Sequence, residues 1–85
     1  MQKTIYTDEH AVFLAKLREA RERAGLTQVD AAARMEVTQS FVSKCERGER
    51  RLDIVELNSW CRALGISLAK FAGELEKTLG KTRKR

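Results

Sequence analysis

The side chains with the most evident chemistry in this sequence are amide, hydroxyl and basic groups that recur between residues 39 and 47. On a helix, at about 100° per residue, they fall within one arc of roughly 140°. The members of this polar arc are Gln39, Ser40, Ser43, Lys44 and Arg47. An amide can pair with adenine through two hydrogen bonds, Lys and Arg donate to guanine, and Ser can serve either base. The polar arc therefore predicts a helix face that reads base edges in the major groove of DNA.

The opposite arc of the same helix is apolar and predicts burial. Phe41, Val42 and Cys45 occupy it, and the acid Glu46 lies at the boundary between the two arcs. For Phe41 we favour packing against the next helix, because a large aromatic side chain is usually buried, and contact with a thymine methyl group is the alternative. For the polar arc the alternative is an ordinary solvated face.

The residues before this helix make the DNA-binding prediction more specific. Gln28 begins a short helix, Ala32 lies in its middle and Val37 lies in the turn that follows. Two short helices joined by a tight turn match the spacing of a helix-turn-helix motif, here over about residues 27–47. Ala32 suits the point where the helices cross, because a larger side chain would push them apart.

An all-α fold is predicted for the rest of the chain. The sequence contains no proline, and its apolar residues recur every three or four positions. Residues that can cap a helix mark five starts, at Thr7, Thr27, Thr38, Asp53 and Ser67. Asp30 and Glu56 follow two of these starts at the spacing of a capping box. Helix ends are predicted at Gly25, residues 36–37, Gly48 and Gly65.

The length of 85 residues suits one domain, which we place at residues 8–79. Residues 1–7 then form an N-terminal extension, and residues 80–85 form a basic C-terminal tail. The formal net charge is +5, but residues 81–85 supply four of the 17 Lys and Arg side chains, so the rest of the chain is close to neutral. We interpret the tail as a solvated end, with a phosphate-contacting arm as the alternative.

Several functional classes find no support in the sequence. No apolar run reaches the ~20 residues of a membrane span, and the N-terminus lacks the apolar stretch of a secretory signal, so we expect a cytoplasmic protein. One histidine and two cysteines do not complete a zinc site, and we expect no metal and no cofactor. Enzymatic activity is not expected, because a catalytic constellation is absent. Cys45 and Cys61 are predicted to be buried thiols, with a redox switch as the alternative.

Taken together, these segments resemble the Cro and lambda-repressor type of helix-turn-helix protein, the XRE family. The resemblance covers residues 13 to about 75 and rests on residues 17–21, 25–28, 32–35, 37–44, 46–48 and 63–67. It implies a compact, lambda-repressor-like domain of five helices whose third helix enters the major groove. Glu36 departs from the family pattern, which commonly has glycine there, and this predicts a small left-handed backbone strain or another turn.

The resemblance also implies roles for individual residues. Base reading is implied for Gln39, Ser40 and Lys44. Phosphate contacts are implied for Gln28, Thr38, Ser43, Arg47, Arg50 and Arg51. A structural ion pair is implied between Arg21 and Glu46, in which removal of one partner would leave a buried charge.

The last predicted helix carries an apolar stripe that we assign in part to a homodimer contact, since a small core gains from association. Its members are Leu68, Phe71, Leu75 and Leu79. A membrane-surface helix is the weaker alternative. We therefore expect a dimeric repressor that reads a palindromic or pseudopalindromic operator in double-stranded DNA. The alternatives are the antitoxin of a toxin–antitoxin pair, which would also bind a toxin, and a restriction-modification controller.

Overall fold

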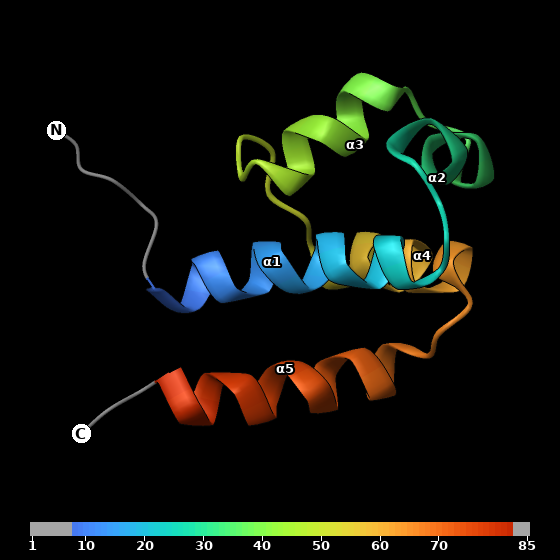
Figure 1. The fold of residues 1–85 in the computed structure, drawn as a ribbon. Helices are drawn as coiled ribbons and strands as arrows, with labels where there is room; N and C mark the ends of the chain where they lie inside the picture. The colour runs from blue at the N-terminus through green and yellow to red at the C-terminus, as the bar shows by residue number, and fades with distance from the viewer. Residues whose placement is uncertain (1–7, 83–85) are drawn as a thin grey trace, which may run out of the picture.

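The computed structural model describes residues 8–82, which form five helices joined by short turns (Figure 1). Their bounds are α1 Asp8–Arg23, α2 Gln28–Met35, α3 Gln39–Glu46, α4 Ile54–Leu64 and α5 Leu68–Thr82. No strand occurs between residues 8 and 82, and the predicted all-α fold is confirmed. None of these helices is both long and apolar enough to cross a membrane. Thr7, the predicted start of the first helix, lies outside the described residues.

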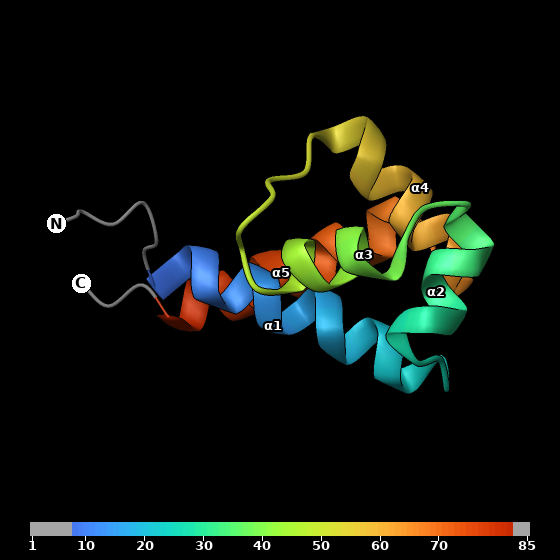
Figure 2. The ribbon, with the colours of Figure 1, turned by 90° about the horizontal axis from the view of Figure 1, so that it is seen from above.

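The helices lie in three layers. In Figure 1, α2 and α3 form the top layer, α1 and α4 the middle layer, and α5 the bottom layer. Seen from above, α3 lies between the first turn of α4 on one side and the C-terminal half of α1 on the other (Figure 2). The top layer therefore leaves the outer face of α3 uncovered by the other helices.

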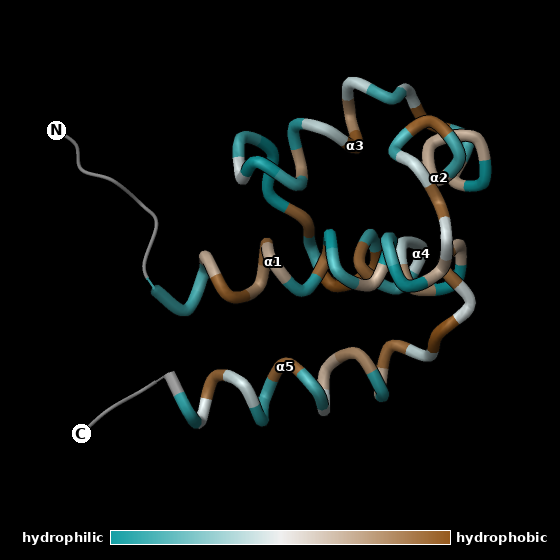
Figure 3. The backbone as a smooth tube through the Cα atoms, in the orientation of Figure 1, coloured by the Kyte–Doolittle hydropathy of each residue, from teal (hydrophilic) through white to brown (hydrophobic). Residues whose placement is uncertain are grey.

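The core lies between these layers and takes side chains from all five helices. Hydrophobic positions alternate with hydrophilic ones along α1 and α5, as an amphipathic helix requires (Figure 3). Trp60 of α4 is the largest fully buried side chain. The other buried apolar residues are Leu17, Ala31, Ala32, Val42, Cys45, Leu57, Cys61, Leu64 and Phe71.

The predicted helix caps are present in the described part of the chain. Thr27 and Asp30 form a reciprocal capping box, in which each side chain accepts a hydrogen bond from the other residue's backbone N–H at 3.0 to 3.1 Å. Asp53 and Glu56 make the same arrangement at 2.8 to 3.0 Å. Two hydroxyl groups, those of Thr38 and Ser67, each accept from the backbone N–H three residues on. Local sequence thus determines where four of the helices begin.

The turn between α2 and α3 depends on one strained residue. Glu36 has φ 60° and ψ 43°, in the left-handed region, and it is the only non-glycine residue of the described chain with a positive φ. Its backbone N–H donates to the carbonyl groups of Ala32 and Ala33, which closes α2. Ala32 itself is only 4% exposed and belongs to the buried core. The predicted left-handed strain at Glu36 is therefore present.

The structure changes two details expected of α5. Phe71 is only 3% exposed and packs edge-on against Phe13 of α1, so within the predicted stripe it belongs to the core and not to the part available for a contact between copies. Leu68 and Leu75 also pack against that core, and Leu79 is half-buried. In addition, α5 continues to Thr82, so Gly80 is helical and does not begin a tail. An amphipathic helix can bury its stripe in its own domain, and sequence periodicity does not distinguish that from a dimer contact.

Candidate nucleic-acid interface

The outer face of α3 gathers the polar side chains that the sequence singled out. Gln39, Ser40 and Lys44 are exposed, and Ser43 is half-buried. On the opposite side of the helix Val42 and Cys45 are almost wholly buried, and they fasten α3 to the layer beneath. The helix therefore presents hydrogen-bonding groups outward from a rigid support.

The acidic side chain of α3, Glu46, does not lie on this face. Glu46 is 8% exposed, and its carboxylate accepts three hydrogen bonds from two other helices. Arg21 of α1 donates from Nε to Oε2 at 2.6 Å and from Nη2 to Oε1 at 3.1 Å. Gln28 of α2 donates from Nε2 to Oε1 at 3.0 Å. The hydrogen bond to Glu46 raises the pKa of Arg21, so the guanidinium stays charged at every ordinary pH.

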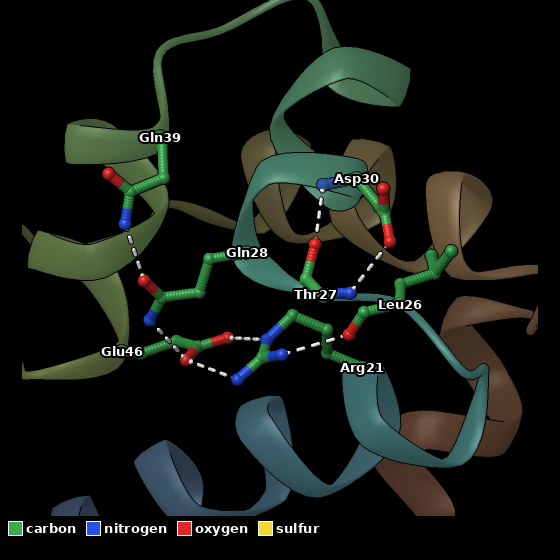
Figure 4. A network of polar contacts seen from close by, with 7 residues as sticks. All are labelled: Arg21, Leu26, Thr27, Gln28, Asp30, Gln39 and Glu46. Atoms are coloured by element: carbon green, nitrogen blue, oxygen red, sulfur yellow. Dashed lines mark hydrogen bonds and ion pairs between the residues drawn. The ribbon is translucent and has the colours of Figure 1, made fainter.

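Arg21 also joins the start of the helix-turn-helix segment to α1. Its Nη1 donates to the backbone carbonyl of Leu26 at 2.9 Å, immediately before the Thr27 cap (Figure 4). One buried guanidinium thus connects the end of α1, the start of α2 and the end of α3. The ion pair of Arg21 with Glu46 holds the two helices of the motif in their mutual orientation.

Gln39 is held by the same network. Its Nε2 donates to Oε1 of Gln28 at 2.7 Å, and Gln28 is in turn fixed by Glu46 (Figure 4). A primary amide has two N–H donors and a carbonyl oxygen, so Gln39 keeps one donor and its acceptor for another partner. The buried ion pair therefore orients an amide at the N-terminus of α3, where a side chain reaches deepest into a groove.

The arginines after α3 have acidic partners. Arg47 donates to Glu49 at 2.9 and 3.1 Å and also contacts the Ser43 hydroxyl. The hydrogen bonds from Arg47 lower the pKa of Glu49. Both residues are exposed, with about half of each side chain accessible, so solvent screens the pair and another anion can compete for the guanidinium.

Arg50 is more fully engaged than Arg47. It donates to both carboxylate oxygens of Glu56 at 3.1 and 2.6 Å, and its guanidinium lies 5.1 Å above the centre of the Phe41 ring. The pKa of Glu56 is lowered by this hydrogen bond and by the backbone N–H of Asp53. Phe41 is half-buried and packs against the core, which agrees with the packing role favoured from the sequence. Arg50 thus ties the loop after α3 to α4.

Arg51 and the two cysteines are the remaining candidates for binding a ligand. Arg51 is exposed and makes no ion pair within residues 8–82. No group of three His, Cys, Asp or Glu side chains that could hold a metal ion occurs in the described chain. Cys45 and Cys61 are both free thiols and both buried.

Comparison with known proteins identifies the family. A family model described as a helix-turn-helix domain matches residues 12–72. The solved structure of an XRE-family like protein from Pseudomonas syringae pv. tomato str. DC3000 is 43% identical and superposes with a TM-score of 0.77. That alignment covers 82% of this chain and 85% of the other. This chain is an XRE-type helix-turn-helix protein.

Two further similarities concern controller proteins. The helix-turn-helix protein is 33% identical over 64 residues to Control protein C.MunI from Mycoplasma sp, an alignment that covers 75% of this chain and 84% of the relative. It is 25% identical to a single-residue mutant of the restriction-modification controller protein C.Esp1396I. That crystal structure superposes with a TM-score of 0.82 over 93% of this chain and 100% of the other. The helix-turn-helix protein is a DNA-binding regulator, and α2 and α3 form its motif.

Sequence reasoning missed several contacts in the helix-turn-helix protein, and three of them involve residues assigned to DNA binding. It assigned Gln28 only to phosphates, whereas in the structure the Gln28 side chain accepts a hydrogen bond from Gln39. It assigned Glu56 only to a helix cap, and the structure gives it Arg50 as well. It did not consider Glu49 as a partner of Arg47. An acid two residues from a basic side chain was a visible signal for the last pair, whereas the other two depend on how the helices pack.

Proposed function

We propose that this protein is a sequence-specific repressor that binds DNA as a dimer, with α3 of each copy in the major groove of one half-site. The observation that carries the proposal is the chemistry of the exposed α3 face. It offers amide, hydroxyl and ammonium groups, and the acid of the helix is held inward by Arg21 and Gln28. Such a face can approach bases and phosphates without repelling them.

In this proposal Gln39, Ser40 and Lys44 read bases. Gln39 is suited to adenine because its free N–H and carbonyl oxygen can form a bidentate pair, while Lys44 donates to guanine. Dimeric readers of this kind contact half-sites about 34 Å apart, which is one turn of the duplex. The protein acts in the cytoplasm, and neither a catalytic activity nor a cofactor is part of the proposal.

The proposed phosphate contacts surround the reading residues. Thr38 accepts from the backbone with its oxygen and keeps its O–H as a donor, and Gln28 keeps one N–H. Ser43 and Arg47 lie one and two turns further along the helix face. Arg50 is left out of this set, because Glu56 and Phe41 already hold its guanidinium.

Selection of bound sequences from a random duplex library, followed by fluorescence anisotropy on the enriched duplex, tests the proposal. Gln39→Ala and Lys44→Ala should each weaken binding to the selected duplex by about 5- to 150-fold, the range of one bidentate base contact. Binding to a scrambled duplex should change much less. Lys70→Ala is the matched control, since Lys70 is an exposed lysine on α5, in the layer opposite α3. Selection of no consensus, or parent-like affinity of both α3 variants, would contradict the proposal.

A restriction-modification controller is the second candidate function. It is favoured by the similarity to Control protein C.MunI and by the superposition that covers the whole of a C.Esp1396I chain. If this candidate is correct, the selected operator should occur beside a restriction endonuclease gene. A chromatin immunoprecipitation experiment that places the operator only at unrelated promoters would exclude it.

A further inference from the structure

The layered fold restricts where a second copy can bind if two α3 helices are to read one duplex, and this inference rests on the proposed dimeric function. Both reading helices must face the same side of the DNA. α5 lies in the layer opposite α3 (Figure 1), so a contact through the outer side of α5 would turn the two α3 helices away from each other. The second copy must therefore bind beside α3, on a flank of the molecule.

One flank of α3 carries an unusual apolar exposure. Ile54 and Val55, in the first turn of α4, are 63% and 70% exposed. This turn lies at the edge of the molecule beside α3, on the side opposite α1 (Figure 2). Two adjacent β-branched side chains in water at this position are unfavourable, and burial against another protein surface would remove the cost.

The same patch also contains a hollow that can receive them. Ile54 lines this hollow together with Leu52, Leu57 and Phe13. An apolar projection thus lies beside a hollow that is apolar on one part of its wall, and His10, Arg51 and Asp53 line the rest. A twofold contact requires this combination, because each copy must offer both halves of the interaction.

The edge of the patch carries one basic and one acidic side chain, so the patches of two copies can be complementary in charge. Arg51 and Asp53 line the same hollow, and neither makes an ion pair among residues 8–82. Asp53 uses one carboxylate oxygen to cap α4 and has the other available. In a twofold arrangement Arg51 of each copy can face Asp53 of the other, which gives two equivalent ion pairs.

We infer that the first turn of α4, centred on Ile54 and Val55, is the surface through which a second copy of this chain binds. The apolar pair of each copy enters the hollow of the other, and Arg51 pairs with Asp53 across the interface. In this arrangement Arg51 binds the second copy and not a DNA phosphate. The dimer contact lies on α4 and not on α5. The loop of residues 47–53 then connects each reading helix directly to the dimer contact.

Disulfide cross-linking tests the proximity of the two patches. Val55→Cys and Val29→Cys place a thiol at equally exposed positions, each the second residue of its helix, and Val29 lies on α2, away from the patch. The native thiols of Cys45 and Cys61 are buried and do not interfere. A disulfide forms only when Cα atoms approach within about 7 Å. Under mild oxidation Val55→Cys should give a linked dimer and Val29→Cys should not; equal linking of both, or no linked dimer from Val55→Cys, would overturn the assignment.

Self-association of neutral polar variants gives an independent measurement. Replacement of both Ile54 and Val55 with Gln removes four buried apolar side chains per dimer, so the dimer dissociation constant in sedimentation velocity should rise at least about 30-fold. The control Val29→Gln should dimerise as the parent does, and Leu79→Gln on α5 should do so as well. Parent-like association of the double variant would overturn the assignment.

The DNA measurements separate failure of this interface from failure of the proposed function. The double variant should bind a duplex with a single half-site as tightly as the parent does, and lose only the additional affinity for two half-sites. A parent that binds no selected duplex would contradict the proposed function, whatever the cross-linking result.

Discussion

Glu46 is the single residue that determines which charges α3 presents to DNA. Its sequence position suggested a residue at the edge of the polar arc, whereas three hydrogen bonds from Arg21 and Gln28 hold its carboxylate inside. A carboxylate on the outer face would repel phosphates. The inward position removes that repulsion and uses the acid to orient Gln28 and Gln39.

Loss of the Glu46 charge should be costly for folding. Glu46→Gln keeps the shape of the side chain but leaves the Arg21 guanidinium, only 10% exposed, without its counter-charge. We expect the free energy of unfolding to fall by about 3 to 5 kcal/mol, the usual cost of breaking a buried ion pair. Urea denaturation measures this. Glu19→Gln, in the exposed pairs with Lys16 and Arg23, is the control and should change stability far less. A loss at Glu46 as small as that of the control would contradict the structural role.

Glu49 should restrain DNA binding, because it occupies the guanidinium of Arg47. Glu49→Gln frees Arg47 and removes a negative charge beside α3, so affinity for all duplex sequences should rise by about threefold, with a steeper dependence on salt. Anisotropy titrations at several salt concentrations provide the measurement. Glu76→Gln makes the same charge change on α5 and should have a smaller effect. Unchanged affinity of the Glu49 variant would show that Arg47 takes no part in phosphate binding.

The left-handed turn between α2 and α3 is the most informative feature at the scale of elements. Glu36 adopts φ 60°, a conformation that costs an L-residue roughly 1 kcal/mol or more and costs glycine almost nothing. Glu36→Gly should therefore raise the free energy of unfolding by about 1 kcal/mol. The same replacement at Glu76, an exposed position in the middle of α5, should lower it by about 1 kcal/mol. Urea denaturation that finds the same sign at both positions would contradict this account.

Helix boundaries were predictable because their causes are local. The capping boxes at Thr27 and Asp53, and the left-handed turn at Glu36, depend on residues within four positions of each other. The burial of Phe71 within the α5 stripe was not predictable, because it depends on Phe13, a residue of α1 more than 50 positions earlier in the chain. The polar arc of α3 was predictable from the periodicity of one helix. Its support by Gln28 and the engagement of Arg50 by Glu56 required the packed structure.

The two thiols report on the integrity of the whole molecule. Cys45 and Cys61 are 1% and 0% exposed, and burial raises the pKa of Cys45 to about 11 and also raises the pKa of Cys61. Since the thiolate is the reactive form, native protein at pH 8 should react with Ellman's reagent far more slowly than a free thiol. Both thiols should become reactive in urea over the same transition that circular dichroism detects. Rapid reaction of either thiol without urea would contradict the buried assignment and favour the redox switch.

The link between Gln39 and Gln28 also has a consequence for how relatives of this protein acquire new operators. Ser40 and Lys44 are exposed and make no hydrogen bond to each other or to α2 among the described contacts, so each can change alone during divergence. Gln39 donates to Gln28, and Gln28 and Arg21 both donate to Oε1 of Glu46. A new residue at position 39 therefore takes the hydrogen-bond donor away from the Gln28 carbonyl oxygen. Positions 28 and 39 are therefore expected to vary together among homologues, whereas positions 40 and 44 are expected to vary independently.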